Sequence, residues 1–431
     1  MTAWEIKGWC PGALRPMPSG DGLVVRIRPP MGRLTPPQAH AIAEAAQTHG
    51  NGVIDLSTRA NLQLRGVTEA SHPPLIANFR AHGLIDPDIG TETLRNLIIA
   101  PFRSTPPTNL TSPPTPALPH EGERGAPRPD HSPELGLHAL PSPPWTADGV
   151  GQHPAEDIET LARTLTAALA TLPRLPAKFG FALDTGPRPV LTSASADIRV
   201  ERAANGQVIL RPDGHPLGKL VNDLASDALA LITWFIAAGG VTNGRGRMAA
   251  LIAKGAVPPG CDTAPARSLP QPAPGPHPEG WLVALALGQM QAKTLAFLAA
   301  LGHEIRPTPW RMLLVVGATG LPAFPGLITD PADPILRVTA CTGAPGCPQA
   351  LAETRTLARG LAGHLPNGQG LHVSGCAKGC AHPGPSDMTL VATADGFDLV
   401  RGGTAQDTPL HRGLSPGAIP DLLKAPHAPS L

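Results

Sequence analysis

The feature that most constrains this chain is a group of four cysteines towards its C-terminal end. Cys341 and Cys347 form a C-x5-C pair, and Cys376 and Cys380 form a C-x3-C pair after a gap long enough for a helix. Four thiolates are what a cubane iron–sulfur cluster needs, one for each iron. Glycine and proline between the cysteines favour tight loops whose backbone N–H groups can point at the sulfurs. The pattern predicts a [4Fe–4S] cluster on these four residues.

Two other interpretations of the cysteines compete with this one. A structural zinc site favours C-x2-C or C-x4-C spacings, which the observed pairs fit poorly. Unrelated buried cysteines would rarely form two tight pairs. The pattern of residues 349–364 indicates a helix, whose positive N-terminal end would face the negative cluster. Cys10 and Cys261 lie outside the pairs, and the sequence assigns neither a role.

Charge and chain ends exclude several classes of protein. The 34 Lys and Arg residues against 33 Asp and Glu residues give a net charge of +1, unlike the basic balance of nucleic-acid-binding proteins. The N-terminus has no basic region followed by an apolar stretch, so we expect no signal peptide. The longest apolar run, residues 228–240, is shorter than the roughly 20 residues that cross a bilayer. We expect a cytoplasmic enzyme, where reducing conditions favour metal-bound cysteines over disulfides.

Two proline-rich stretches divide the chain. Residues 104–150 lack apolar periodicity and predict a disordered insertion, and residues 257–279 predict a linker. Between them we expect helices at 158–172 and 217–238 and strands at 178–183 and 207–211. The expected units are a first half-domain (1–103), the insertion (104–150), a first α+β domain (151–256), the linker (257–279), a second half-domain (280–335) and a cluster-binding α+β domain (336–431).

A strand–helix–strand pattern occurs twice. The copies are 22–28, 36–49 and 61–65, and then 280–286, 291–301 and 311–316. Each places a threonine before its last strand, Thr58 in the first and Thr308 in the second. One such unit cannot bury its sheet alone, so we expect an α+β fold of two pseudo-symmetric halves. Arg26 and Arg28 align with alanines of the second copy, so the first copy is the one expected to face an anionic ligand.

On these patterns the chain resembles the siroheme-containing sulfite and nitrite reductases, over most of its length except the insertion. The phrase Ser57-Thr-Arg-Ala-Asn-Leu-Gln-Leu-Arg-Gly66 strengthens the resemblance. It implies that each half is a ferredoxin-like half-domain followed by a siroheme/[4Fe–4S]-type α+β domain. In that family a Thr-Arg-x-Asn-x-Gln segment lines a tetrapyrrole pocket, and basic residues surround its distal face. The matching residues here are Arg26, Arg59, Arg95 and Lys178.

Within the family the chain is most similar to an oxygen-using branch that acts in aerobic cobalamin biosynthesis. The phrases that carry this are Cys10-Pro-Gly, Arg15-Pro-Met with Gly20-Asp-Gly22, and residues 372–383. The reductases also have a second lysine two positions after the one matching Lys178, where this chain has Gly180. The branch implies conversion of precorrin-3A to precorrin-3B, in which O2 hydroxylates C20 and a γ-lactone closes from the ring A acetate.

Such a substrate is rimmed with acetate and propionate groups. A guanidinium fork matches a carboxylate through two parallel hydrogen bonds, so several arginines are expected around it. Arg26 and Arg28 are two residues apart on a predicted strand and so share a face. Arg28, Arg65 and Arg311 stay open between ligand contact and solvated surface charge, as do the amides of Asn61 and Gln63.

The branch further implies O2, an electron donor and a mononuclear non-haem iron. A set of two histidines and one carboxylate would suit that iron. The candidates are His372, His382, Asp387 and His303, and no motif selects among them. Two other functions stay open. One is a siroheme sulfite or nitrite reductase in which Cys380 bridges cluster and siroheme. The other is an electron carrier or scaffold without catalysis.

Overall fold

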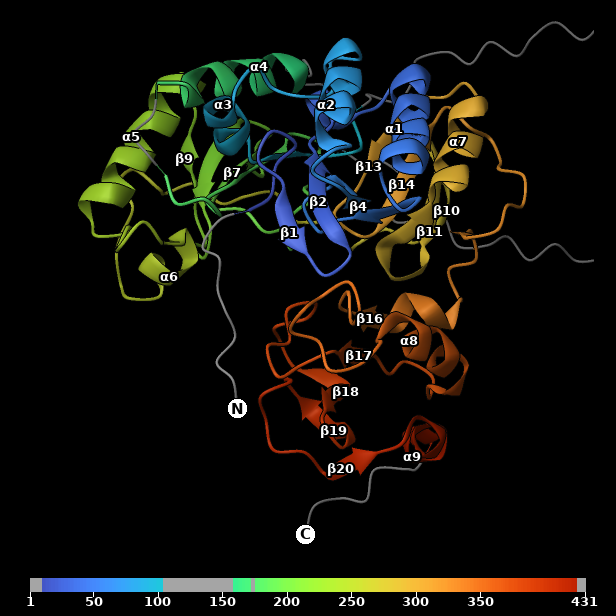
Figure 1. Ribbon diagram of the computed structural model, residues 1–431. Helices are drawn as coiled ribbons and strands as arrows, with labels where there is room; N and C mark the ends of the chain where they lie inside the picture. The colour runs from blue at the N-terminus through green and yellow to red at the C-terminus, as the bar shows by residue number, and fades with distance from the viewer. Residues whose placement is uncertain (1–9, 104–157, 172–174, 425–431) are drawn as a thin grey trace, which may run out of the picture.

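The computed structural model describes residues 10–103, 158–171 and 175–424, and the predicted insertion at 104–150 lies outside these ranges. The described chain contains four five-stranded sheets. Figure 1 shows the two half-domains next to each other, a first α+β unit on one side of them, and the C-terminal unit below. This arrangement confirms the predicted α+β class. No helix in the described ranges combines the length and hydropathy needed to cross a membrane.

The first half-domain is an antiparallel sheet in the order β1-β2-β4-β3-β12, covered by two helices. Its elements are β1 (Met17–Ser19), β2 (Gly22–Ile27), η1 (Pro30–Gly32), α1 (Pro36–His49), β3 (Val53–Leu56), β4 (Leu62–Val67) and α2 (His72–Ala81). Thr35 starts α1 with a capping box, because its hydroxyl accepts the N–H of Gln38 while the Gln38 side chain accepts the N–H of Thr35. The predicted strand and helix of this copy are confirmed, and β3 is an addition.

The second half-domain repeats this design. Its sheet has the order β10-β11-β14-β13, with β15 also paired to β11. Its elements are β10 (Gly275–His277), β11 (Gly280–Leu285), η2 (Ala286–Gly288), β12 (Gln289–Gln291), α7 (Ala292–Ala300), β13 (Ile305–Pro307), β14 (Met312–Val316) and β15 (Leu327–Ile328). Helices α1 and α7 pack against each other, and one apolar core runs through both copies. The strand β12 crosses over to pair with β3, so the two halves share a sheet.

The turn before the last strand shows how the copies correspond. The sequence aligned Thr58 with Thr308, but the hydrogen bonds identify Ser57 as the equivalent residue. Ser57 Oγ accepts the N–H of Arg59 at 3.3 Å, as Thr308 Oγ1 accepts the N–H of Trp310 at 3.3 Å. Arg59 therefore corresponds to Trp310. The correction shifts the alignment of this turn by one residue.

The two larger units also repeat each other. In both, three parallel strands are followed by two antiparallel ones, in the orders β5-β6-β7-β8-β9 and β16-β17-β18-β19-β20. The first unit comprises α3 (Ile89–Leu94), β5 (Leu97–Ile99), α4 (Ile158–Leu169), β6 (Phe181–Asp184), β7 (Ile198–Arg202), β8 (Val208–Pro212), β9 (Lys219–Leu220), α5 (Leu224–Ala237) and α6 (Met248–Ile252). The second comprises η3 (Pro334–Arg337), β16 (Val338–Ala340), α8 (Arg355–Leu361), η4 (Ala362–His364), β17 (Leu371–Ser374), β18 (Ser386–Thr393), β19 (Gly396–Gly403), β20 (His411–Leu414), η5 (Pro416–Ala418) and α9 (Ile419–Lys424).

Two predicted helices begin later than expected. The helix predicted over 217–238 starts at Leu224, because β9 occupies the first part and the carboxylate of Asp223 caps the N–H of Ser226. The helix predicted over 349–364 starts at Arg355, because the preceding residues form an irregular loop whose Leu351 N–H donates to Gly375. That loop carries the connection from the first cysteine pair to α8.

A buried network of charges joins the C-terminal unit to the first half-domain. Asp55 of β3 lies between Arg65 of β4 (3.5 Å) and Arg355 of α8 (2.7 Å). Arg65 also pairs with Asp21 at 2.7 Å and donates to the carbonyl of Gly346 at 2.9 Å. The loop between Cys341 and Cys347 is thereby fixed against the β1–β2 hairpin. Arg65 acts in this joint, which answers the question that the sequence left open for it.

Candidate functional site: a four-cysteine loop and an arginine cluster

The cysteines begin at the ends of neighbouring parallel strands. Cys341 follows β16 and Cys376 comes after β17, and these strands pair in register with Ala340 opposite Val373. Because parallel strands end at the same edge of a sheet, both cysteines lie at one edge. The N–H of Gly375 donates to Cys341 Sγ at 3.1 Å. This is the backbone N–H to sulfur contact that the glycines between the cysteines predicted.

The remaining two cysteines reach the same place from the loops. The Cys380 thiol hydrogen-bonds to Cys341 and lies within electrostatic range of Cys347 and Cys376. The contact with Cys380, aided by the N–H groups of Gly375 and of a neighbouring glycine, lowers the pKa of Cys341 to about 6. The same contact and the charges of the other sulfurs raise the pKa of Cys380. All four sulfurs are therefore gathered, with donors that favour a thiolate.

The four thiols supply one ligand for each iron of a cubane cluster. Each cysteine of a cubane binds a different iron, so the four sulfurs surround a cluster without converging on one point. Within the described residues, no three His, Cys, Asp or Glu side chains are placed to hold one metal ion together. A zinc site would need such a convergence. Cys261, half-buried in the loop before β10, stands apart from this group.

A second feature is a row of arginines that belongs to the first half-domain and the first α+β unit. We call it the arginine cluster. Electrostatic interactions link its neighbours one to the next. In order along the row, its members are Arg95, Arg28, Arg26, Arg59 and Arg247. It unites three of the four basic residues predicted to hold the tetrapyrrole.

The members of the arginine cluster differ in how their charge is balanced. Arg95 pairs with Asp86 at 2.7 Å and Arg28 with Glu92 at 3.4 Å. Within the described chain, neither Arg26 nor Arg59 has a carboxylate within 4.0 Å of its guanidinium. These two side chains are therefore the ones whose charge an anionic ligand would balance.

Neutral groups hold these two arginines in place. Arg26 donates to Gln63 Oε1 at 2.7 and 3.1 Å, so the amide that the sequence left open orients it. Arg59 donates to the carbonyl of Lys178 at 3.0 Å and to Ser195 Oγ at 3.3 Å. Burial lowers the pKa of Arg26 to about 10, so the guanidinium stays cationic near neutral pH.

The segment around Cys10 completes the arginine cluster, although no role could be assigned to it from the sequence. The Cys10 thiol hydrogen-bonds to Arg26 and lies within electrostatic range of Arg28 and Arg59. Gly12 holds the segment there, because its carbonyl accepts the N–H of Arg26 at 3.0 Å. A Cβ on Gly12 would lie 2.1 Å from the carboxylate of Glu92 and would displace it from the N–H groups of Ala13 and Leu14 that it accepts. The Cys10-Pro-Gly phrase was the available signal.

Lys178 and Gly180 are the two positions that the resemblance matches to lysines of the reductases. Lys178 is exposed, and only its carbonyl takes part in the contact with Arg59. Gly180 is buried, and a Cβ there would lie 2.9 Å from Nδ2 of Asn96. Asn96 is itself buried and donates to the carbonyl of Phe179 at 2.8 Å. A side chain at this position would therefore have to displace the amide of Asn96.

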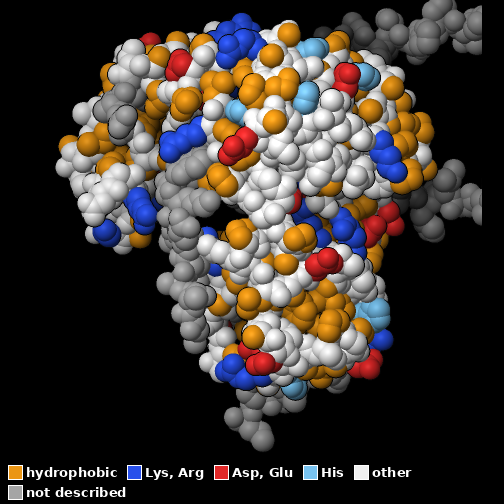
Figure 2. Space-filling view, viewed as in Figure 1, with side chains coloured by type: hydrophobic (Ala, Val, Ile, Leu, Met, Phe, Trp, Pro, Cys, Tyr) orange, Lys and Arg blue, Asp and Glu red, His pale blue; other side chains and the backbone are white. Residues whose placement is uncertain are grey.

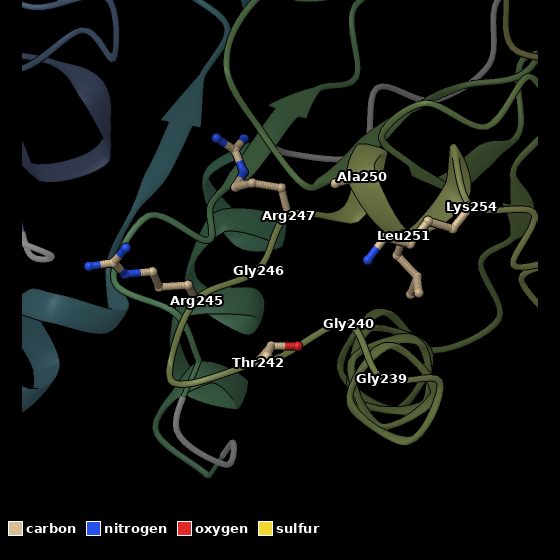
Figure 3. A pocket seen from close by; sticks show the side chains of 9 residues that line it. All are labelled: Gly239, Gly240, Thr242, Arg245, Gly246, Arg247, Ala250, Leu251 and Lys254. Carbon is tan, nitrogen blue, oxygen red and sulfur yellow. The ribbon is translucent and has the colours of Figure 1, made fainter. Parts of the chain in front are cut away.

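A cavity of about 230 Å³ lies next to Arg247, the last member of the arginine cluster. It is lined by residues that follow α5 and by residues of α6. Figure 3 shows that the guanidinium groups of Arg245 and Arg247 extend away from Gly239 and Gly240 on its far side. Arg247 pairs with the fully buried Asp197 at 2.9 Å and shares Ser195 Oγ with Arg59. Arg247 thus supports Arg59, and its glycine-rich surroundings gave no signal of this in the sequence.

Between the upper body and the C-terminal unit, the surface in Figure 2 is hollowed, with Lys and Arg side chains near its rim. Arg311 reaches towards the C-terminal unit from the second half-domain, where it donates at 3.4 Å to the carbonyl of Val338 and to Thr339 Oγ1. It takes no part in the arginine cluster. Arg311 therefore makes a contact between the second half-domain and the C-terminal unit.

The four residues suggested for a mononuclear iron do not form one set. The rings of His372 and His382 have centroids 5.8 Å apart. Asp387 accepts the N–H of Gly370 at 2.7 Å, and His303 lies beside Gly317 in the second half-domain. Among the described residues, no three His, Cys, Asp or Glu side chains are placed to bind one metal ion together. The mononuclear iron stays a prediction.

Comparisons with known proteins agree with this arrangement. Residues 15–82 match the nitrite/sulfite reductase ferredoxin-like half domain. A precorrin-3B synthase from Sinorhizobium sp is 30% identical over 442 residues, covering 94% of this chain and 84% of the relative. A ferredoxin–nitrite reductase from Leptolyngbya laminosa is 34% identical over 94 residues, covering 22% of this chain and 18% of that protein.

A solved structure gives the same fold. The Mycobacterium tuberculosis NirA protein superposes with a TM-score of 0.54, at 15% identity, over 93% of this chain and 79% of that one. At this identity the likeness concerns the fold alone. It agrees with the two pseudo-symmetric halves seen in the sheets.

Proposed function

The chain belongs to the precorrin-3B synthase family, and on that premise we propose that it converts precorrin-3A to precorrin-3B with molecular oxygen in aerobic cobalamin biosynthesis. The observation that carries this proposal is the extent of the similarity. It runs over nearly the whole chain for the precorrin enzyme, whereas for nitrite reductases it covers about a fifth. The chain is thus an enzyme of the oxidoreductase class, and its relation to sulfite and nitrite reductases indicates an iron–sulfur or siroheme-type cofactor.

The proposed reaction inserts one oxygen atom into the macrocycle at C20, and the ring A acetate closes a γ-lactone. The second oxygen atom leaves as water, which takes up two electrons and two protons. An external electron donor supplies the electrons. A [4Fe–4S] cluster, when bound, supplies one-electron transfer. Cys341, Cys347, Cys376 and Cys380 would hold it, since their sulfurs are gathered at one sheet edge with N–H donors around them.

The arginine cluster is the proposed site for the carboxylates of the precorrin. Arg26 and Arg59 would each bind one carboxylate, because their charges lack an ion-pair partner in the described chain and their guanidinium groups are already oriented. Arg95 would act less directly, since Asp86 already engages it in two hydrogen bonds. Lys178 is exposed beside Arg59 and would reach the rim of the substrate.

A siroheme-dependent sulfite or nitrite reductase is the second candidate, favoured by the exposure of Cys380, whose thiol could bridge to a siroheme iron. Gly180 counts against it, because this chain lacks the second lysine of the reductases and a side chain there would press on Asn96. The loss of that positive charge weakens a cage for small oxyanions and leaves a wider carboxylated ligand unaffected.

The test is a visible spectrum of the full chain after anaerobic purification, with iron and acid-labile sulfide counts. The proposal predicts a broad cluster shoulder without Soret bands, with about four sulfides per chain. Iron beyond that of the cubane would support the mononuclear iron. Siroheme bands would make the chain a reductase, and zinc without sulfide would contradict both functions. Cys376→Ala should lose the shoulder, and the matched control Cys261→Ala should keep it.

A further inference from the structure

His372 on β17 is fully buried, yet neither of its ring nitrogens has a hydrogen-bond partner within the described residues. Buried polar groups in folded proteins are almost always paired, so an unpaired one calls for an explanation. Burial, with smaller effects from His382 and Arg311, lowers the pKa of His372 to about 4. An imidazole ring carries one N–H donor when it is neutral and two when it is protonated, so His372 has a donor in either state.

The polar edge of the ring faces the second cysteine pair. A Cβ on Gly379, the residue before Cys380, would lie 3.8 Å from Cε1 of His372. Cε1 is the ring carbon bonded to both nitrogens, so the edge that carries Nδ1 and Nε2 is the one turned to the Cys376–Cys380 turn. Backbone direction agrees, because His372 lies on the opposite face of β17 from Leu371 and Val373, which pack into the apolar core.

Other partners for the ring are engaged elsewhere. Thr389, opposite His372 in the sheet, donates to the carbonyl of Gly403 at 2.9 Å. His382 is hydrogen-bonded to the carbonyl of Pro385 at 3.1 Å. Arg311 is the nearby cation that acts on His372, and a positive neighbour disfavours a cationic metal at this ring. The hydrogen-bond partner that His372 lacks would therefore lie at the Cys376–Cys380 turn.

We propose that His372 donates a hydrogen bond to a sulfur of the cluster site at the Cys376–Cys380 turn and thereby raises the reduction potential of the cluster. The inference rests on the proposed function in one respect, that the four cysteines hold a [4Fe–4S] cluster. Reduction adds negative charge to the cluster, and an N–H donor at a sulfur stabilises the more negative state. His372 is a positioning residue in this proposal and takes no part in the oxygen chemistry.

Replacing the ring by phenylalanine keeps the buried volume and removes the donor. We expect His372→Phe to lower the ratio of reduced to oxidised cluster at a fixed potential about tenfold, which is about 59 mV for a one-electron couple. His372→Gln keeps an N–H donor and should shift the potential less. The matched control is His364→Phe, a partly buried histidine of the same unit with an unpaired Nδ1, at the far end of α8 from the cysteine loop. It should leave the potential unchanged.

The measurement is an EPR-monitored redox titration of the full chain with its cluster, preceded by a sulfide count. Wild type without sulfide would defeat the cluster assignment itself. A full cluster with an unshifted potential in His372→Phe would overturn only the role of His372. Should His372→Phe fail to hold a cluster, pulsed EPR of the reduced wild type labelled with 15N-histidine decides. A 15N coupling that disappears in His372→Gln supports the inference in that case, and no coupling in wild type overturns it.

Discussion

Adding a single methyl group at Gly180 tests whether the position of the second reductase lysine is closed. In Gly180→Ala the new Cβ would lie 2.9 Å from Nδ2 and 3.1 Å from the backbone oxygen of Asn96. Asn96 is buried, and its amide holds the carbonyl of Phe179 at 2.8 Å. On the other side, the N–H of Gly180 donates to the buried carboxylate of Asp197 at 3.0 Å. Neither neighbour can move without losing a hydrogen bond.

The expected cost follows from these contacts. Overpacking of this kind costs about 1–3 kcal/mol, and a hydrogen bond lost inside the protein adds about 1–3 kcal/mol. Against this, Gly to Ala restricts the unfolded chain and stabilises by about 0.4–1 kcal/mol where the backbone allows it. We expect Gly180→Ala to destabilise the first α+β unit by about 2 kcal/mol. That corresponds to a fall of about 8–16 °C in the midpoint for a unit of this size.

The assay is thermal unfolding followed by circular dichroism, on the full chain. The matched control is Gly360→Ala in α8, where the space around the glycine is open and the substitution should stabilise by about 0.5–1 kcal/mol. A Gly180→Ala protein as stable as wild type would refute the reasoning. It would mean that Asn96 yields easily and that the site could accept the lysine after all.

Three further predictions concern charge and cofactor. Arg26→Gln should weaken anaerobic precorrin binding about tenfold to a hundredfold, because a cation without an ion-pair partner is lost. The control variant Arg163→Gln changes an exposed residue and should bind normally. An equal loss of affinity in both variants would contradict the role of Arg26 in substrate binding. Burial raises the pKa of Asp184 to about 6, so the folded state binds its proton more tightly and stability falls as pH rises from about 4 to about 6. Asp184→Asn should remove that fall, up to about 3 kcal/mol in urea titrations, and an unchanged pH profile would count against it. Cys376→Ala should release iron and sulfide during anaerobic purification, whereas Cys261→Ala should retain both; retention in the former would exclude the residue as a ligand.

Much of the fold could be predicted because it depends on local periodicity. Strand β2, helix α1 and their repeats in the second half have apolar residues at regular spacing, and the structure has them nearly where expected. The short strands β3 and β13 were missed, because three or four residues carry too little pattern. The predicted start of α8 was wrong, because a hydrogen bond to the distant Gly375 holds the preceding residues in a loop.

The site divides in the same way. The cysteine group was visible because its four members form two pairs that are close in sequence, and the structure brings their thiols near one another. The charge balance of the arginines could not be predicted from the sequence, because their partners are distant along the chain. Glu92 neutralises Arg28, and Ser195 orients Arg59. The role of His372 likewise depends on the packing of β17 against the cysteine turn, which no sequence spacing reveals.

The most direct test of the central claim is the fate of isotopic oxygen. The full chain, loaded with its cluster, is supplied with precorrin-3A, a reducing system and 18O2, and the product is analysed by mass spectrometry. The account predicts a product that carries one 18O atom, formed only when reductant and the intact cysteine set are both present. A product without 18O, or a chain that leaves the precorrin unchanged and reduces sulfite or nitrite instead, would contradict it.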